Sequence, residues 1–242
     1  MKIGTFFTAL FLAVAVAPVS AQDSGADNTL TPNEVKNGWT LLFNGTSLDG
    51  WKTVKGGKPV EPGQGWSVEE GIIKLDPESI AGDIVTDRKY RNFIFKVDFR
   101  IFEGSNSGIK YYVNENAKGN ITSLGCEYQI VDDWNNPDAS IKNGTHKTAA
   151  LYDILACTKP TELYREDFNT AMIIVSDGKV IHWLNGKKVL EYVKGGQTWR
   201  EGIERSKFKG NNNFARYDEG YILLQDHHSR MEFKNIKIKE LK

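Results

Sequence analysis

The stretch FIFKVDFRI, residues 93–101, carries the clearest structural signal in the chain. Every second side chain in it is apolar, and the charged residues Lys96, Asp98 and Arg100 lie between them. Because successive side chains of a β-strand point to opposite faces, this alternation predicts a strand with one buried face and one mostly wet face. The chain is therefore expected to contain a sheet that covers an apolar core.

Shorter segments of strand-like sequence surround this stretch. They are rich in β-branched and aromatic residues, and Gly, Asn and Asp lie between them. We predict strands at residues 39–43, 66–69, 72–75, 108–113, 126–131, 149–155, 171–193 (a three-strand meander), 220–224 and 231–241.

Turn residues divide the meander into its strands. Asp177-Gly178 and Asn185-Gly186 supply the positive φ angles that two-residue hairpin turns require. In the last strand, the apolar positions change parity between Phe233 and Ile236. Such a change predicts a β-bulge, which inserts one extra residue into a strand.

Many short strands with glycine-rich turns and almost no helix predict an all-β fold. One short helix is expected over residues 198–208, with Thr198 as its cap. Both terminal regions resemble strands and the connections are long, which favours a jelly-roll sandwich of two antiparallel sheets. Residues 39–242 are expected to form this single domain.

The start of the chain is typical of an export signal. Met1-Lys2 is basic, residues 3–18 are almost wholly apolar, and Val19-Ser20-Ala21 is a small-residue cleavage site. The apolar run is shorter than the roughly 20 residues that a membrane-spanning helix needs. We therefore expect a signal peptide at residues 1–21, a polar linker at 22–38, no membrane span, and a periplasmic or secreted protein.

The composition argues against nucleic acid as a partner. The chain has 31 Lys and Arg residues and 31 Asp and Glu residues, so its formal net charge is +0. Without a basic field, a neutral polymer or a small polar ligand is the better fit. The two cysteines, Cys126 and Cys157, can pair in an oxidising compartment or remain free thiols, and they provide no metal-site spacing.

Polar side chains within apolar strands are the candidate functional residues, because a buried polar group costs free energy unless it is paired or used. Glu127 and Gln129 share one face of the strand at 126–131, where Glu127 either pairs with a cation such as Lys110 or faces a ligand groove. The predicted catalytic residues are Glu127, His227 and Lys110. The predicted substrate-binding residues are Asn106, Gln129, Asp132, His146, Tyr152, Gln225 and Asp226.

The sequence contains no nucleophile elbow, phosphate loop, dinucleotide fingerprint or H-E-x-x-H zinc motif. Acid–base chemistry by carboxylates and imidazoles is what remains. Trp51, Trp66, Trp134 and Tyr152 are candidates for stacking on sugar rings, although aromatic side chains of this kind are more often part of a core. His182, with apolar neighbours, is expected to be a strand histidine without a catalytic role.

Several blocks of the sequence, taken together and in order, resemble the 3-keto-disaccharide hydrolase family. They are GWTLLFNGTSLDGW (38–51), NSGI (106–109), EYQIVDD (127–133), ALYD (150–153), LLQDH (223–227) and FKNI (233–236). The sequence departs from the usual family pattern at Lys110 and Lys234, where Arg is common, and at His228, where Gly is usual.

The resemblance implies a concanavalin A-like jelly roll that cleaves a 3-keto-glycoside or oligosaccharide outside the cytoplasm. The C2 proton is removed, the C1 substituent leaves, and water adds. Glu127 or His227 would be the base, and Lys110 or a divalent metal ion (Ca²⁺ or Mg²⁺) would stabilise the enolate. Gln129, Asp132 and Gln225 would position hydroxyl groups. A carbohydrate-binding module without catalytic activity and an ordinary glycosidase remain as alternatives.

Overall fold

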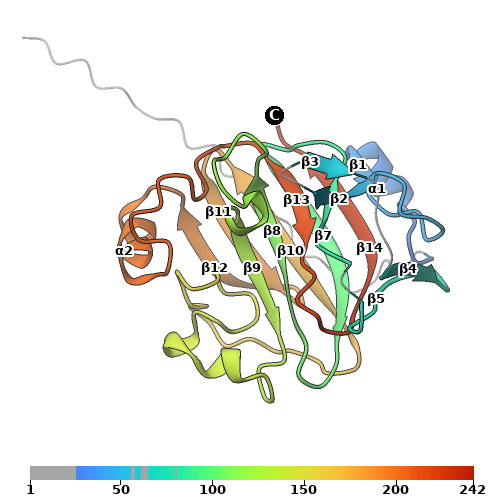
Figure 1. The fold of residues 1–242 in the computed structure, drawn as a ribbon. Helices are drawn as coiled ribbons and strands as arrows, with labels where there is room; N and C mark the ends of the chain where they lie inside the picture. Colours follow the sequence, from blue (N-terminus) through green and yellow to red (C-terminus); the bar gives the residue numbers. More distant parts are fainter. Residues whose placement is uncertain (1–25, 56–57, 61–64, 80) are drawn as a thin grey trace, which may run out of the picture.

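The structure is a computed structural model that describes residues 26–55, 58–60, 65–79 and 81–242. Two antiparallel sheets are stacked on one another (Figure 1). The predicted signal peptide at residues 1–21 lies outside the described residues. No helix within the described ranges is both long enough and apolar enough to cross a membrane.

The larger sheet has the strand order β12-β11-β10-β7-β14-β5-β4. Strand β5 pairs with residues 231–233 of β14, and β1 pairs with residues 237–239 of the same strand. Its strands, in chain order, are β1 (Trp39–Leu41), β4 (Trp66–Glu69), β5 (Ile72–Leu75), β7 (Phe93–Ile101), β10 (Phe168–Ser176), β11 (Lys179–Leu184), β12 (Lys187–Val193) and β14 (Met231–Glu240).

The smaller sheet has the order β3-β2-β6-β13-β8-β9, so that β9 lies at its edge. Its strands are β2 (Trp51–Lys55), β3 (Lys58–Val60), β6 (Ile84–Thr86), β8 (Asn106–Val113), β9 (Cys126–Val131) and β13 (Tyr221–Leu224). Short 3-10 helices lie in the connection around β9: η1 (Ile121–Ser123), η2 (Pro137–Ser140) and η3 (Lys142–Gly144).

The predicted alternation of β7 is confirmed. Its five apolar side chains are fully buried, and the residues between them are partly exposed. Across the core they face the inner side of the smaller sheet, which contributes Ile109, Tyr111, Tyr128 and Ile130. Removing one such aromatic side chain typically costs 3–5 kcal/mol. This packing fixes the positions of β8 and β9 from the core side.

The predicted turns and bulge are also confirmed. Asp177, Gly178, Asn185 and Gly186 all have positive φ, between 46° and 81°. The pairing of β14 with β7 shifts register between Lys234 and Lys237, at the expected bulge.

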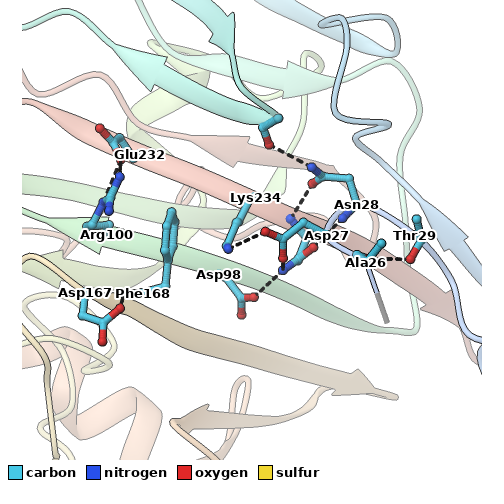
Figure 2. A network of polar contacts seen from close by, with 12 residues as sticks. Ala26, Asp27, Asn28, Thr29, Asp98, Arg100, Asp167, Phe168, Glu232 and Lys234 are labelled. Atoms are coloured by element: carbon cyan, nitrogen blue, oxygen red, sulfur yellow. Dashed lines mark hydrogen bonds and ion pairs between the residues drawn. The ribbon is translucent and has the colours of Figure 1, made fainter. Parts of the chain in front are cut away.

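The prediction of a polar linker over residues 22–38 is wrong for the part that the structure describes. A short helix, α1 (Pro32–Lys36), begins with a capping box between Thr31 and Glu34. Before it, Asp27 accepts a hydrogen bond from Lys234 (2.7 Å) on β14, as Figure 2 shows. This segment therefore packs on the outer face of the larger sheet, a long-range contact that a local reading of polar sequence does not reveal.

Two further predictions are corrected. The expected helix exists as α2 (Gln197–Arg205), but its N-cap is Gly196 and not Thr198, which lies within the first turn. Residues 149–155, expected to form a strand, form turns with isolated bridges, because Ala149 (φ 70°) and Asp153 (φ 64°) adopt left-handed backbone conformations. With α1 included, the described residues contain two α-helices where one was predicted.

Candidate functional site

A pocket of about 150 Å³ lies on the outer face of the smaller sheet. It is lined by Asn106, Lys110, Ser123, Glu127, Gln129, Asp138, Tyr152, Lys207, Phe208, Gln225 and His227. Seven of the ten sequence-predicted site residues are among them.

Strands β8 and β9 form the floor of the pocket. Lys110 pairs with Glu127 across the two strands, and Gly108 pairs with Gln129. Every residue of both strands is buried, since the core covers the inner face and loops cover much of the outer face. The predicted common face of Glu127 and Gln129 is confirmed, and this face lines the pocket.

Lys110 and Glu127 form a buried ion pair. The Lys110 Nζ lies 3.4 Å from Glu127 Oε2 and donates a hydrogen bond to the Thr122 carbonyl oxygen (2.9 Å). The two residues are only 6% and 9% exposed, so the pair is screened little by solvent. Burial raises the pKa of the nearby Asp83 carboxyl, and the Lys110 ammonium opposes this effect. The Lys110 ammonium thus interacts with the carboxylates of both Glu127 and Asp83 within a largely buried site.

Gln129 lies between the two carboxylates of the pocket. In one orientation its amide nitrogen donates to Asp138 Oδ2 (3.3 Å). In the turned orientation the nitrogen donates to Glu127 Oε1 (3.1 Å) and to the Ser107 carbonyl oxygen (3.0 Å). Gln129 therefore lies between Glu127 and Asp138 along the pocket.

His146 lies behind Asp138, buried and bonded through both ring nitrogens. Its Nδ1 is 2.8 Å from Asp138 Oδ1, and its Nε2 is 2.9 Å from Asp153 Oδ1. The Tyr152 ring lies beside it at a tilt of 46°, with 4.4 Å between ring centroids. Asp153 also accepts a hydrogen bond from the Lys207 backbone N–H (2.6 Å). The predicted binding residue His146 thus supports a pocket residue and does not line the pocket.

Tyr152, Lys207 and Phe208 form one wall. The Lys207 Nζ lies 4.4 Å from the centre of the Tyr152 ring, a cation–π arrangement. Burial raises the pKa of the Tyr152 hydroxyl, and the carboxylates of Asp138 and Glu127 add to that effect. The hydroxyl therefore stays protonated at neutral pH.

Asn106, Gln225 and His227 form the other wall. Gln225 Oε1 is buried, and among the described residues it has no hydrogen-bond partner. Such an acceptor is costly unless a donor meets it, and a sugar hydroxyl is a suitable donor. His227 is exposed at the rim of the pocket.

Two predicted binding residues, Asp132 and Asp226, do not line the pocket. Asp132 is fully buried, and it accepts hydrogen bonds from Asn135 and from the Gly104 and Trp134 N–H groups. Burial alone would raise its pKa, but these bonds hold the pKa of Asp132 below its ordinary value.

Asp226 accepts bonds from the backbone N–H groups of Gly82 (2.8 Å) and His228 (2.9 Å). Like Asp132, it lies just beyond a strand end. At both positions the carboxylate fixes a loop, which the sequence alone did not distinguish from ligand binding.

Of the predicted aromatic platforms, only Tyr152 lines the pocket. Trp51 and Trp66 are in the core, and Trp134 is 57% exposed outside the pocket. Conversely, the sequence analysis missed Asp138, Ser123, Lys207 and Phe208, which come from irregular segments without strand periodicity.

The arrangement of possible ligand side chains bears on whether the protein binds a metal ion. Within the described ranges, no group of three or more His, Cys, Asp or Glu side chains is placed to hold a metal ion. The thiols of Cys126 and Cys157 are both free.

A larger hollow, of about 400 Å³, lies beside β4 and β5. Four of its charged side chains form ion pairs, Lys74 with Glu69 (2.7 Å) and Arg230 with Glu232 (3.2 Å). None of the sequence-predicted residues lines it. The smaller pocket is therefore the candidate functional site.

Comparison with known proteins shows the family of the chain. Residues 38–239 match the family described as the 3-keto-alpha-glucoside-1,2-lyase-like domain. The chain belongs to this family. A 3-keto-disaccharide hydrolase from Bacteroides thetaiotaomicron is 30% identical over 232 residues, which cover 85% of this chain and 79% of that protein. The predicted resemblance is confirmed.

Solved structures confirm the fold of this 3-keto-alpha-glucoside-1,2-lyase-like chain. A Parabacteroides distasonis protein with the provisional name glycosyl hydrolase is 34% identical, with a TM-score of 0.80, and the match covers 89% of this chain and all of that one. A second protein of that organism and name is 23% identical, with a TM-score of 0.65, over 85% of this chain and all of its own length. The predicted all-β sandwich is confirmed, in a family of carbohydrate hydrolases.

Proposed function

We propose that the protein cleaves glycosides whose sugar carries a carbonyl at C3, by elimination of the C1 substituent followed by addition of water. The observation that carries this proposal is the buried pair of Glu127 and Lys110 in the pocket, 3.4 Å apart. A base beside a cation suits a substrate that loses a proton and gains negative charge on adjacent groups. Membership of the family supports the same chemistry.

The C3 carbonyl makes the neighbouring C2 proton acidic, because the resulting anion is delocalised onto the carbonyl oxygen as an enolate. In this proposal Glu127 removes the C2 proton, and the Lys110 ammonium stabilises the enolate oxygen. The C1 substituent is β to the carbonyl, so its bond breaks as the enolate collapses to an enone. Addition of water across the new double bond then completes a net hydrolysis.

Glu127 is a better base than His227, the other residue predicted for this role. Glu127 is on the pocket floor beside the cation, whereas His227 is exposed at the rim. We assign contacts with sugar hydroxyls to His227, Asn106 and Gln225. The unpartnered Gln225 oxygen supports a hydroxyl donor at that position.

The decisive experiment compares methyl 3-keto-glucoside with its unoxidised parent as substrates of the purified protein, each with and without EDTA. Selective cleavage of the keto sugar supports the proposal, and Glu127→Gln should abolish it while the protein remains folded. Cleavage of the parent would instead indicate an ordinary glycosidase. Binding of either sugar without cleavage would indicate a carbohydrate-binding module, and loss of activity in EDTA would indicate that a metal ion takes part.

We also propose that the protein is exported. The basic start, the apolar run over residues 3–18 and the small residues at 19–21 support this proposal. Expression of the full chain in a bacterial host and mass analysis of the periplasmic protein test it. A mature chain beginning at Gln22 is expected, and an uncleaved chain retained in the cytosol would contradict it.

A further inference from the structure

The elimination just described also needs an acid, because the departing aglycone oxygen must receive a proton unless it is a stable anion. Two carboxyl side chains line the pocket, Glu127 and Asp138. Since Glu127 is the proposed base, Asp138 remains as the acid. The sequence analysis gave no role to Asp138, which lies in the short helix η2 of an irregular segment.

The order of groups along the pocket matches the order of reacting atoms in the sugar. Lys110 contacts Glu127, and Gln129 lies between Glu127 and Asp138, bonded to one or the other according to the orientation of its amide. A sugar with its C3 oxygen at Lys110 has C2 near Glu127 and C1 on the Asp138 side. The base and the acid are thus placed at adjacent carbons.

Asp138 is also held in a defined orientation from behind. Its Oδ1 is bonded to His146, whose other nitrogen is bonded to Asp153, and the Asp153 side chain is only 1% exposed. An imidazole bonded through both ring nitrogens fixes the orientation of the Asp138 carboxyl. A ring N–H directed at Asp138 Oδ1 would also stabilise the carboxylate that remains after proton donation. On the pocket side, Asp138 Oδ2 accepts a hydrogen bond from the Gln129 amide in one orientation of that amide (3.3 Å), and the turned amide leaves this oxygen to the substrate.

We propose that Asp138 is the general acid of this reaction, and that His146 and Asp153 are positioning residues for it. The inference rests on the proposed function. In the elimination, the Glu127 carboxylate takes the C2 proton, the C1–O bond breaks, and its electron pair leaves with the aglycone oxygen. That oxygen takes the proton of the Asp138 carboxyl, and the sugar becomes an enone with a C1–C2 double bond.

The addition of water restores both residues. The water oxygen bonds to C1 and its proton goes to the Asp138 carboxylate, while C2 takes back a proton from Glu127. At the end Glu127 is ionised and Asp138 is protonated, as they were at the start. The cycle needs no oxidant, reductant or other co-reactant.

The leaving group provides the test, because a nitrophenolate departs without a proton whereas an alkoxide does not. For Asp138→Asn, we expect kcat/KM to fall at least about a hundredfold with methyl 3-keto-glucoside and less than about tenfold with 4-nitrophenyl 3-keto-glucoside. Asp153→Asn should show the same bias to a smaller degree. Asp138→Glu, which retains a carboxyl, should recover part of the activity on the methyl substrate. Urea unfolding of each variant checks that it is folded.

An equal loss with both aglycones in Asp138→Asn would overturn the inference and leave the proposed function standing. Full activity of that variant on the methyl substrate would overturn it as well. If the wild-type protein cleaves neither keto substrate, the proposed function itself has failed, so the two failures are distinguishable. Glu127→Gln serves as the matched control, since loss of the base should slow both substrates alike.

Discussion

The carboxylate of Glu127 lies directly over Gly108 of the adjacent strand. A β-carbon on residue 108 would be 2.6 Å from Glu127 Oε1 and 2.9 Å from its Cγ, closer than real contacts allow. Gly108 is therefore required for the position of this carboxylate and not for an unusual backbone angle. The glycine in the block NSGI is part of the site, although it carries no functional group.

Gly108→Ala should consequently displace the Glu127 side chain. Because a shift of about 1 Å at a reacting group costs about a hundredfold in rate, we expect kcat/KM to fall by about that factor. Steady-state kinetics on the 3-keto substrate measures the loss, and circular dichroism with urea unfolding confirms the fold. Unchanged activity would show that Glu127 is not the base or that its carboxylate moves without consequence.

Lys110 provides a second prediction. Replacement by Met removes the charge that stabilises the enolate, so kcat should fall by about two to three orders of magnitude. Lys110→Arg retains a cation, so it should retain most of the activity. Equal losses in the two variants would indicate that shape, and not charge, is what the pocket needs at this position.

His182 should make stability depend on pH. Its Nδ1 donates to the Ala149 carbonyl oxygen (2.8 Å) and its Nε2 accepts from the Tyr111 hydroxyl (2.8 Å). Burial lowers the pKa of His182 from 6.5 to about 4, although the Ala149 bond acts in the other direction. As the pH falls, the unfolded chain therefore protonates His182 before the folded protein does. The stability that the protein gains by burying neutral His182 is complete above about pH 6.5 and declines as the pH falls toward 4.

Between pH 7 and pH 5 this single group should lower the free energy of unfolding by about 2 kcal/mol. His182→Gln is the matched control, because an amide can make both hydrogen bonds but does not titrate. Urea unfolding at several pH values should give a steeper dependence for the wild type than for this variant. Parallel curves would contradict the assignment.

Asn235 at the bulge of β14 supports a fourth prediction. It has φ 55°, and its side chain bonds to the Asn28 N–H (2.6 Å), Asp27 (2.9 Å) and Asp98 (2.8 Å). Asn235→Gly tolerates the angle and loses these bonds, at a cost of about 2 kcal/mol. Asn235→Ala adds the strain of the left-handed conformation, a further cost of about 1 kcal/mol. Urea unfolding measures both, and equal stability of the two variants would show that the backbone angle does not matter.

The fold was largely predictable because its strands have local signals. The alternation in β7, the Asp-Gly and Asn-Gly turns and the parity change in β14 are each visible within about ten residues. The contact between Asp27 and Lys234 joins segments 207 positions apart, and no local pattern reports it. The same limit explains why residues 26–38 were predicted as a linker.

The site was predictable where it lies on strands. Glu127, Gln129 and Lys110 follow from polar residues on regular strands, where period two gives the face. Asp132 and Asp226 do not line the pocket, because a carboxylate at a strand end satisfies backbone N–H groups as readily as it binds a ligand. Asp138 was missed because irregular backbone gives no rule for the direction of a side chain. Lys207 was missed because the helix expected over residues 198–208 ends at Arg205, before this residue.

The segment that follows β9 has two roles that cannot be separated. Strand β9 is an edge strand, and its open side is occupied by residues 149–152, through bonds such as Gln129 N–H to the Ala150 carbonyl oxygen (3.1 Å) and Tyr152 N–H to the Glu127 carbonyl oxygen (3.0 Å). The same residues bring Tyr152 to the pocket. An exposed strand edge is a template for pairing with another chain. Exchange of this loop to alter substrate preference would therefore also create a risk of aggregation, and solubility would limit how far the pocket can be redesigned.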